Sequence, residues 1–205
     1  MTVWLWVFGS IALTLVCARW SRERASAHAL GKKGQIAEFA YLLGIGVVTG
    51  FVANLQSSLN AILFSLVALL LVLQTPIDLR SHQLARWPTI FSTIGVLAVH
   101  VLRFEMSFGW QQVWIPVAVT AALFLLLCLF SIRWPSQLGW GDVLLVLPLS
   151  FAVGAVNPVL VVWWLLAAAM TASAHGLSIR RSGKRYLPFG PHLLFAAWVI
   201  LAIVL

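Results

Sequence analysis

The sequence predicts an all-α fold, a polytopic membrane bundle of about eight transmembrane helices. Of the 205 residues, 62% are hydrophobic and only 9% are charged, whereas a soluble domain carries about 25% charged residues. The chain also contains several apolar stretches of about 17–20 residues, the length that spans the hydrocarbon core of a bilayer. Since a soluble fold could not cover its surface with so few charges, we expect the chain to reside in a membrane.

The candidate spans are read in order from their runs of hydrophobic residues. They cover residues 2–18, 36–54, 59–77, 88–102, 113–132, 143–156, 158–175 and 191–205. The first is followed by Arg19, Arg22 and Arg24 and has no basic residue before it, so we expect a retained helix and not a cleaved signal peptide. The sixth is short and meets the seventh at Asn157-Pro158. These two form either a tight helical hairpin or one long broken segment.

The basic residues predict the orientation. With the N-terminus outside, all 13 Lys and Arg residues except Arg103 fall in inside loops, namely 19–35, 78–87, 133–142 and 178–191. Because cytoplasmic loops carry the excess of basic residues, this is the expected topology. It also accounts for the formal net charge of +8. We therefore expect a lipid bilayer as the partner and no nucleic acid.

The only two aspartates, Asp78 and Asp142, then both lie at the cytoplasmic face. Asp78 ends an apolar run, where an ionisable group is costly unless it is paired or functional. The alternative for Asp78 is an interfacial aspartate that is solvated or paired with Arg80. Asp142 follows Gly139 and Gly141, glycines that would let an extended substrate lie beside the carboxylate. The alternative for Asp142 is a helix N-cap.

Two carboxylates at one membrane face can share a proton if they come within a few ångströms. The ionised partner can then take a proton from an attacking water, while the protonated partner donates a hydrogen bond to a peptide carbonyl. The two titrate as a unit, so the sequence does not assign the base to either. Other catalytic patterns, including HExxH, GxSxG and the P-loop, are absent. Neither the five histidines nor the two cysteines show metal-ligand spacing, so we expect no metal and no cofactor.

Three segments of the chain carry a resemblance. They are Ile77-Asp78-Leu79-Arg80, the GxGD string Gly139-Trp140-Gly141-Asp142 with Gly154 behind it, and Pro188-Phe189-Gly190-Pro191 before the last span. In sequence, order and spacing these are similar to the motifs of the type IV prepilin peptidases, membrane aspartic proteases. The resemblance covers residues 59–205 and implies a six-helix catalytic core there. Residues 1–58 would add two N-terminal transmembrane helices joined by a short basic cytoplasmic loop.

The resemblance implies an aspartic endopeptidase in which Asp78 and Asp142 are catalytic and Gly139 and Gly141 shape the substrate site. Its substrate would be a prepilin or pseudopilin with a basic leader and an apolar helix, cleaved at the cytoplasmic face of the cell membrane. No metal or nucleotide would take part. Larger members carry a cysteine-rich methyltransferase domain between the first two spans. Residues 19–35 stand there in this chain without a cysteine, so we expect no such domain.

The chain departs from the family pattern in three places, one of which is Ser150, where a glycine is frequent. Leu144 stands where a lysine is common, and the string around Ala85-Arg86 differs from the proline followed by Asp or Asn that is common after the first aspartate. Leu144 favours an alternative, a non-catalytic membrane scaffold or assembly factor descended from the family, whose aspartates would lie too far apart to share a water. A small transporter would place polar groups near the bilayer midplane instead. Another GxGD protease fits the PFGP position less well.

Overall fold

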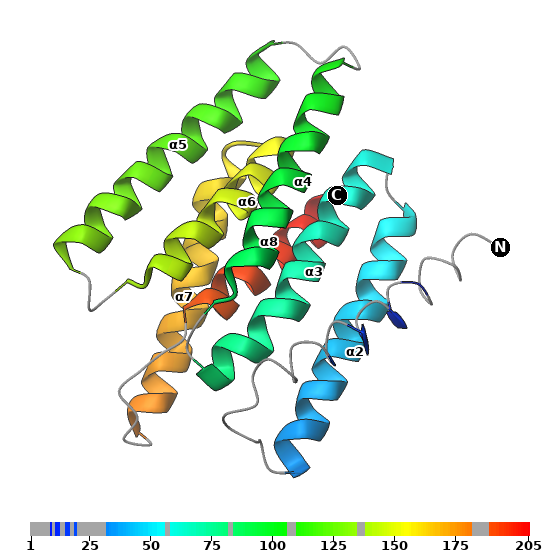
Figure 1. Ribbon diagram of the computed structural model, residues 1–205, viewed down its shortest axis with the longest axis vertical. Coiled ribbons are helices and arrows are strands. Elements are labelled where there is room, and N and C mark those ends of the chain that lie inside the picture. Colours follow the sequence, from blue (N-terminus) through cyan, green and yellow to red (C-terminus); the bar gives the residue numbers. More distant parts are fainter. Residues whose placement is uncertain are drawn as a thin grey trace.

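The computed structural model describes residues 32–55, 58–81, 84–105, 110–134, 138–181 and 189–205, and a few isolated positions before residue 20. Over these residues the protein contains seven α-helices and no strand (Figure 1). The helices are α2 (Lys32–Leu55), α3 (Ser58–Ser81), α4 (Arg86–Glu105), α5 (Trp110–Arg133), α6 (Trp140–Val156), α7 (Leu160–Arg181) and α8 (Gly190–Val204). The predicted all-α class is confirmed for this part of the chain.

The expected number of about eight spans is wrong for the described residues. Three helical stretches are long and apolar enough to cross a membrane: Leu59–Asp78, Trp114–Arg133 and Leu160–Leu177. Four further apolar stretches, in α2, α4, α6 and α8, are only 10–17 residues long. At 1.5 Å per residue even 17 residues cover about 26 Å, less than the roughly 30 Å of hydrocarbon. The predicted first span, residues 2–18, lies outside the described residues apart from isolated positions.

The core lies where α3, α6 and α8 meet. Each of these helices packs against the other two, and their facing side chains are fully buried, including Phe64, Leu71, Leu149, Leu194 and Leu201. Figure 1 shows α5 and α2 along opposite edges of the bundle, with α3, α4 and α6 between them. The helices that carry the two aspartates, α3 and α6, are therefore central ones.

Hydrogen bonds between side chains and neighbouring helices join the outer helices to this core. The indole of Trp164 in α7 donates to the carbonyl oxygen of Leu193 in α8 at 2.8 Å. The indole of Trp198 in α8 donates to the Thr49 hydroxyl of α2 at 3.1 Å. Apolar surface drives helix association only weakly in a bilayer, so such bonds help to define which helices pair.

The connection between α6 and α7 is a tight turn. Asn157 has an extended backbone that ends α6, and its side-chain oxygen accepts a hydrogen bond from the backbone N–H of Val159 at 2.9 Å. Helix α7 begins three residues later and runs back along α6 (Figure 1). Of the two arrangements that the sequence left open here, the structure has the helical hairpin.

Candidate active site

The structure brings Asp78 and Asp142 together from two different helices. Asp78 lies in the last turn of α3, and Asp142 lies in the first turn of α6. Asp78 Oδ2 and Asp142 Oδ1 are each 3.2 Å from the point that a Cβ on Gly190 would occupy. The two oxygens can therefore be separated by no more than twice that distance. At such a separation the charge of one carboxylate acts directly on the other.

Asp78 does not have the surroundings of a solvated interfacial residue. Its side chain is only 5% exposed, and helix α3 continues past it to Ser81. The side chain of Arg80, the ion-pair partner considered above, lies outside the described part of the chain. A buried carboxylate is expensive unless nearby groups stabilise it or share its proton, and Asp142 is one such group.

Asp142 is not the N-cap of α6, which was the alternative for this residue. The N-cap is Gly139, with φ −75° and ψ 145°, and Asp142 is the third helical residue. The backbone N–H groups of Gly139 and Gly190 donate to the Asp142 carboxylate. A capping box consists of two hydrogen bonds at the start of a helix. The bond from Gly139 is one of these two, in which the side chain of the third helical residue accepts from the backbone N–H of the N-cap residue. This bond and the positive end of the helix dipole orient the carboxylate.

Gly190 is a third residue of the site, and it was not among the site residues predicted from the sequence. A Cβ at this position would lie 3.2 Å from an oxygen of each aspartate and 3.2 Å from Leu84 Cδ1. A side chain there would have to push apart the two carboxylates. The sequence feature that could have identified Gly190 is the string Phe189-Gly190-Pro191. That string served only as one of the motifs that carry the family resemblance. Pro188, its first residue, lies outside the described residues.

Leu84, in the connection between α3 and α4, covers the glycines and was also missed. A Cβ on Gly141 would lie only 3.0 Å from Leu84 Cβ. The glycine at position 141 therefore allows this connection to approach the start of α6. Gly139 is less crowded, because its Cβ would lie 3.7 Å from Asp142 Oδ2, an ordinary contact. No sequence pattern marks a single leucine as a neighbour of a glycine more than fifty positions away.

Gln74 holds this connection in place. The side chain, which is fully buried in α3, accepts a hydrogen bond from the Ala85 backbone N–H at 2.8 Å. Its amide nitrogen donates to the Ala85 carbonyl oxygen at 2.6 Å and to the Thr89 hydroxyl at 2.9 Å. One side chain thus satisfies both backbone groups of Ala85, the residue between Leu84 and Arg86. Gln74 lies one helical turn before Asp78, so the same helix carries a carboxylate and the anchor of the covering loop.

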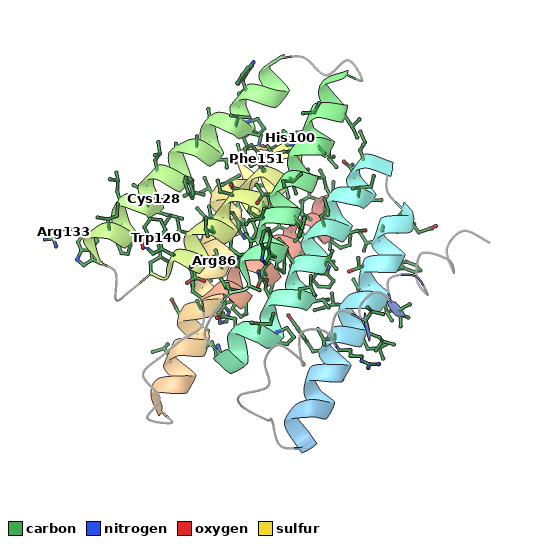
Figure 2. The ribbon with its side chains drawn as sticks, in the orientation of Figure 1. Arg86, His100, Cys128, Arg133, Trp140 and Phe151 are labelled. Atoms are coloured by element: carbon green, nitrogen blue, oxygen red, sulfur yellow. The ribbon has the colours of Figure 1, made fainter. Side chains whose placement is uncertain are left out.

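All four predicted site residues line one open pocket of about 640 Å³. Its walls are formed by Asp78, Leu84, Arg86, Gly139, Trp140, Gly141, Asp142 and Leu144. Figure 2 shows Arg86 and Trp140 near each other on the same side of the bundle, and both side chains are exposed. Leu144, the departure from the family pattern, is part of the wall. A pocket of this size is in the range that holds a small ligand or a short peptide segment.

Within the described residues, no three His, Cys, Asp or Glu side chains lie close enough to hold a metal ion together. The pocket presents a pair of carboxylates with two backbone amides directed at one of them, an arrangement suited to general acid–base chemistry on a bound water. Comparison of the chain with family models, with curated proteins and with solved structures finds no match.

Proposed function

We propose that this chain is a multi-pass membrane aspartic endopeptidase with Asp78 and Asp142 as its catalytic pair. The observation that carries the proposal is the convergence of the two carboxylates from α3 and α6 on Gly190 in one open pocket. They are the only aspartates of the chain. Two buried or half-buried carboxylates brought beside the same glycine are unfavourable for stability unless they share a proton, and aspartic catalysis uses such a shared proton.

The reaction would follow from the position of the pair. One carboxylate, ionised, takes a proton from a water whose oxygen attacks the carbon of the scissile peptide bond. The other, protonated, donates a hydrogen bond to the carbonyl oxygen and stabilises the negative charge that develops there. The C–N bond then breaks as the amine nitrogen receives the proton that the carboxylate pair took from the water. Because the two carboxylates titrate together, we assign these roles to the pair and not to one residue.

The substrate proposed is a prepilin-like protein with a basic leader followed by an apolar helix, as the sequence resemblance implies. The distribution of Lys and Arg favours an outside N-terminus, which would place the pocket at the cytoplasmic face of the cell membrane. Leader cleavage there would leave the apolar helix in the bilayer. An exposed Trp140 at the rim of the pocket is in keeping with a position at a membrane–water interface.

The alternative, a non-catalytic scaffold, rests on Leu144, which lines the pocket where the family commonly has a lysine. A scaffold would leave the aspartates free to drift apart. The position of Asp78 Oδ2 and Asp142 Oδ1, each 3.2 Å from the same point beside Gly190, supports the endopeptidase over the scaffold.

The test is cleavage of a candidate prepilin by the wild type and by Asp78→Asn and Asp142→Asn, with substrate and product separated on a gel. Asn keeps the size of the side chain but cannot act as a base or share the proton. We expect each variant to lose about 10²–10⁴-fold in rate. The double variant should lose no more than either single one, since the two residues act as a unit.

Leu125→Ala on the outer face of α5 is the matched control, because this side chain is 62% exposed and is not among the residues that line the pocket. It should cleave at the wild-type rate. If either Asn variant cleaves at that rate too, the two-aspartate mechanism is wrong. If folded wild type cleaves no prepilin that has a basic leader and an apolar helix, the scaffold becomes the better account.

A further inference from the structure

Two histidines outside the pocket meet between α7 and α8. His175 Nδ1 and His192 Nε2 are 3.0 Å apart, and the ring centroids are 5.1 Å apart at an interplanar angle of 57°. Both residues are half-buried. The two residues are 17 positions apart in sequence, a spacing that belongs to no metal-binding motif. The carboxylate chemistry proposed above does not use either of them.

His192 lies in the first turn of α8, and hydrogen bonds hold the backbone of this turn. The backbone N–H groups of His192 and Leu193 both donate to the Phe189 carbonyl oxygen, at 3.0 and 3.2 Å, and so close the first turn of α8. Trp164, near the other end of α7, donates to the Leu193 carbonyl oxygen at 2.8 Å. The His192 backbone is thus held by hydrogen bonds, and its ring lies against the His175 ring.

Neutral imidazole nitrogens are favoured ligands of Zn²⁺, Ni²⁺ and Cu²⁺. Two ring nitrogens bound to one tetrahedral ion at about 2.0–2.1 Å are separated by roughly 3.3 Å. His175 Nδ1 and His192 Nε2 would need to part by only a few tenths of an ångström to reach this separation. Each ring can free the nitrogen that faces its partner by carrying its hydrogen on the other one, so no net proton has to leave.

We propose that His175 and His192 form a binding site for a divalent transition-metal ion that ties α7 to the first turn of α8. With no third His, Cys, Asp or Glu beside them in the described part of the chain, water fills the remaining coordination positions. The site is therefore weaker than a structural zinc site with four protein ligands. It is a different site from the carboxylate pocket, and it does not depend on the proposed endopeptidase activity.

The location connects the metal site to the carboxylate pair. Gly190, whose backbone N–H donates to Asp142, lies two residues before His192 in the same helical turn. An ion bound to His192 would hold this turn against α7. It would thereby fix the amide that faces the Asp142 carboxylate.

The test uses the full chain in detergent, without a polyhistidine tag, and compares Tm in ZnCl₂ with Tm in EDTA. We expect the wild type to gain about 3–5 °C at a Zn²⁺ concentration near ten times Kd. H175Q and H192Q should each lose this gain. The double variant H28Q/H82Q, which removes two other histidines, should keep it. MgCl₂ should produce no gain, because Mg²⁺ prefers oxygen ligands.

Two results would overturn the site: a wild type whose Tm does not respond to Zn²⁺, or H175Q and H192Q variants that respond as the wild type does. If either variant fails to fold, electron paramagnetic resonance of the wild type with one equivalent of Cu²⁺ decides instead. Two imidazole nitrogens in the copper coordination plane are expected. One nitrogen or none rules the site out.

Discussion

Helices α3 and α5 each contain an apolar stretch of 20 residues, yet they have opposite places in the bundle. The stretch in α3 has a mean hydropathy of 2.0 and is 67% buried, whereas the stretch in α5 has a mean hydropathy of 2.6 and is only 17% buried. The more hydrophobic helix is the one on the outside. Between these two helices, higher hydropathy therefore does not mean deeper burial in the protein, and the less apolar helix carries the polar groups that the site uses.

The same contrast separates the roles of individual side chains. Gln74 and Asp78 are buried in α3 and face the pocket or its covering loop. In α5 the residues exposed on the surface are large and apolar, including Leu125, Leu126 and Leu129. Substitutions in α3 should therefore affect both stability and activity, and substitutions on the outer face of α5 should affect neither. The predictions below run from the largest expected effect to the smallest.

The first prediction contrasts the packing of the two helices. Phe64 of α3 is fully buried and stacks with Trp198 of α8, with ring centroids 6.1 Å apart. Phe64→Ala should lower the free energy of unfolding in detergent by about 3–5 kcal/mol, because it leaves a cavity in the core. Leu125→Ala in α5 should change it by about 0.5 kcal/mol or less. Equal losses in the two variants would show that Leu125 is packed as tightly as Phe64.

The second prediction concerns the contact of α8 with the two carboxylates. Gly190→Ala should reduce kcat/KM for prepilin cleavage by about 10²-fold, since a displacement of the reacting groups by an ångström has a cost of that order. Gly44→Ala in α2 is the matched control, because a Cβ there would meet nothing within 4 Å. A Gly190→Ala enzyme with the wild-type rate would mean that the carboxylates do not act from the positions described above.

The third prediction tests the anchor of the covering loop. Gln74→Leu should cost about 2–3 kcal/mol in unfolding free energy, because the backbone N–H of Ala85 loses its partner and the Ala85 carbonyl oxygen keeps only the Thr89 hydroxyl, at 3.3 Å. Gln74→Glu keeps the acceptor for the Ala85 N–H and loses the donor, so its loss should be intermediate. Both variants should also slow cleavage, since Leu84 and Arg86 flank Ala85 and line the pocket. A Leu variant as stable as the wild type would remove Gln74 from this role.

The smallest effect is expected where α5 meets α6. The Ser150 hydroxyl lies 3.1 Å from the Thr120 hydroxyl of α5 and donates to its own helix at Val146. Ser150→Ala should cost about 0.6 kcal/mol, the average of such bonds between transmembrane helices. Thr171→Ala in α7 removes a hydroxyl whose hydrogen bonds, among the described residues, stay within its own helix, so its effect should be near zero. If Thr171→Ala lost more unfolding free energy than Ser150→Ala, the bond between helices would not be the more important one.

Local hydrophobic runs were enough to predict the helices. The stretches predicted at 59–77 and 143–156 correspond to α3 and α6, which begin and end within a few residues of those limits. The prediction succeeds because a helix satisfies its own backbone hydrogen bonds, so its existence depends on nearby residues alone. The number of full spans was overestimated because a run of apolar residues marks burial in protein and burial in lipid alike, and α6 and α8 are short helices of the core.

The sequence by itself determined the all-α class. It also identified the two aspartates as candidate site residues, since a scarce acidic residue is conspicuous in an apolar chain. Only the tertiary structure decided that Asp78, Asp142 and Gly190 meet, that Leu84 covers Gly141, and that His175 faces His192. The physical reason is the same in each case. Which helices become neighbours, and which faces they turn to one another, depends on the packing of complementary side chains from distant parts of the chain, and sequence separation carries no record of that packing.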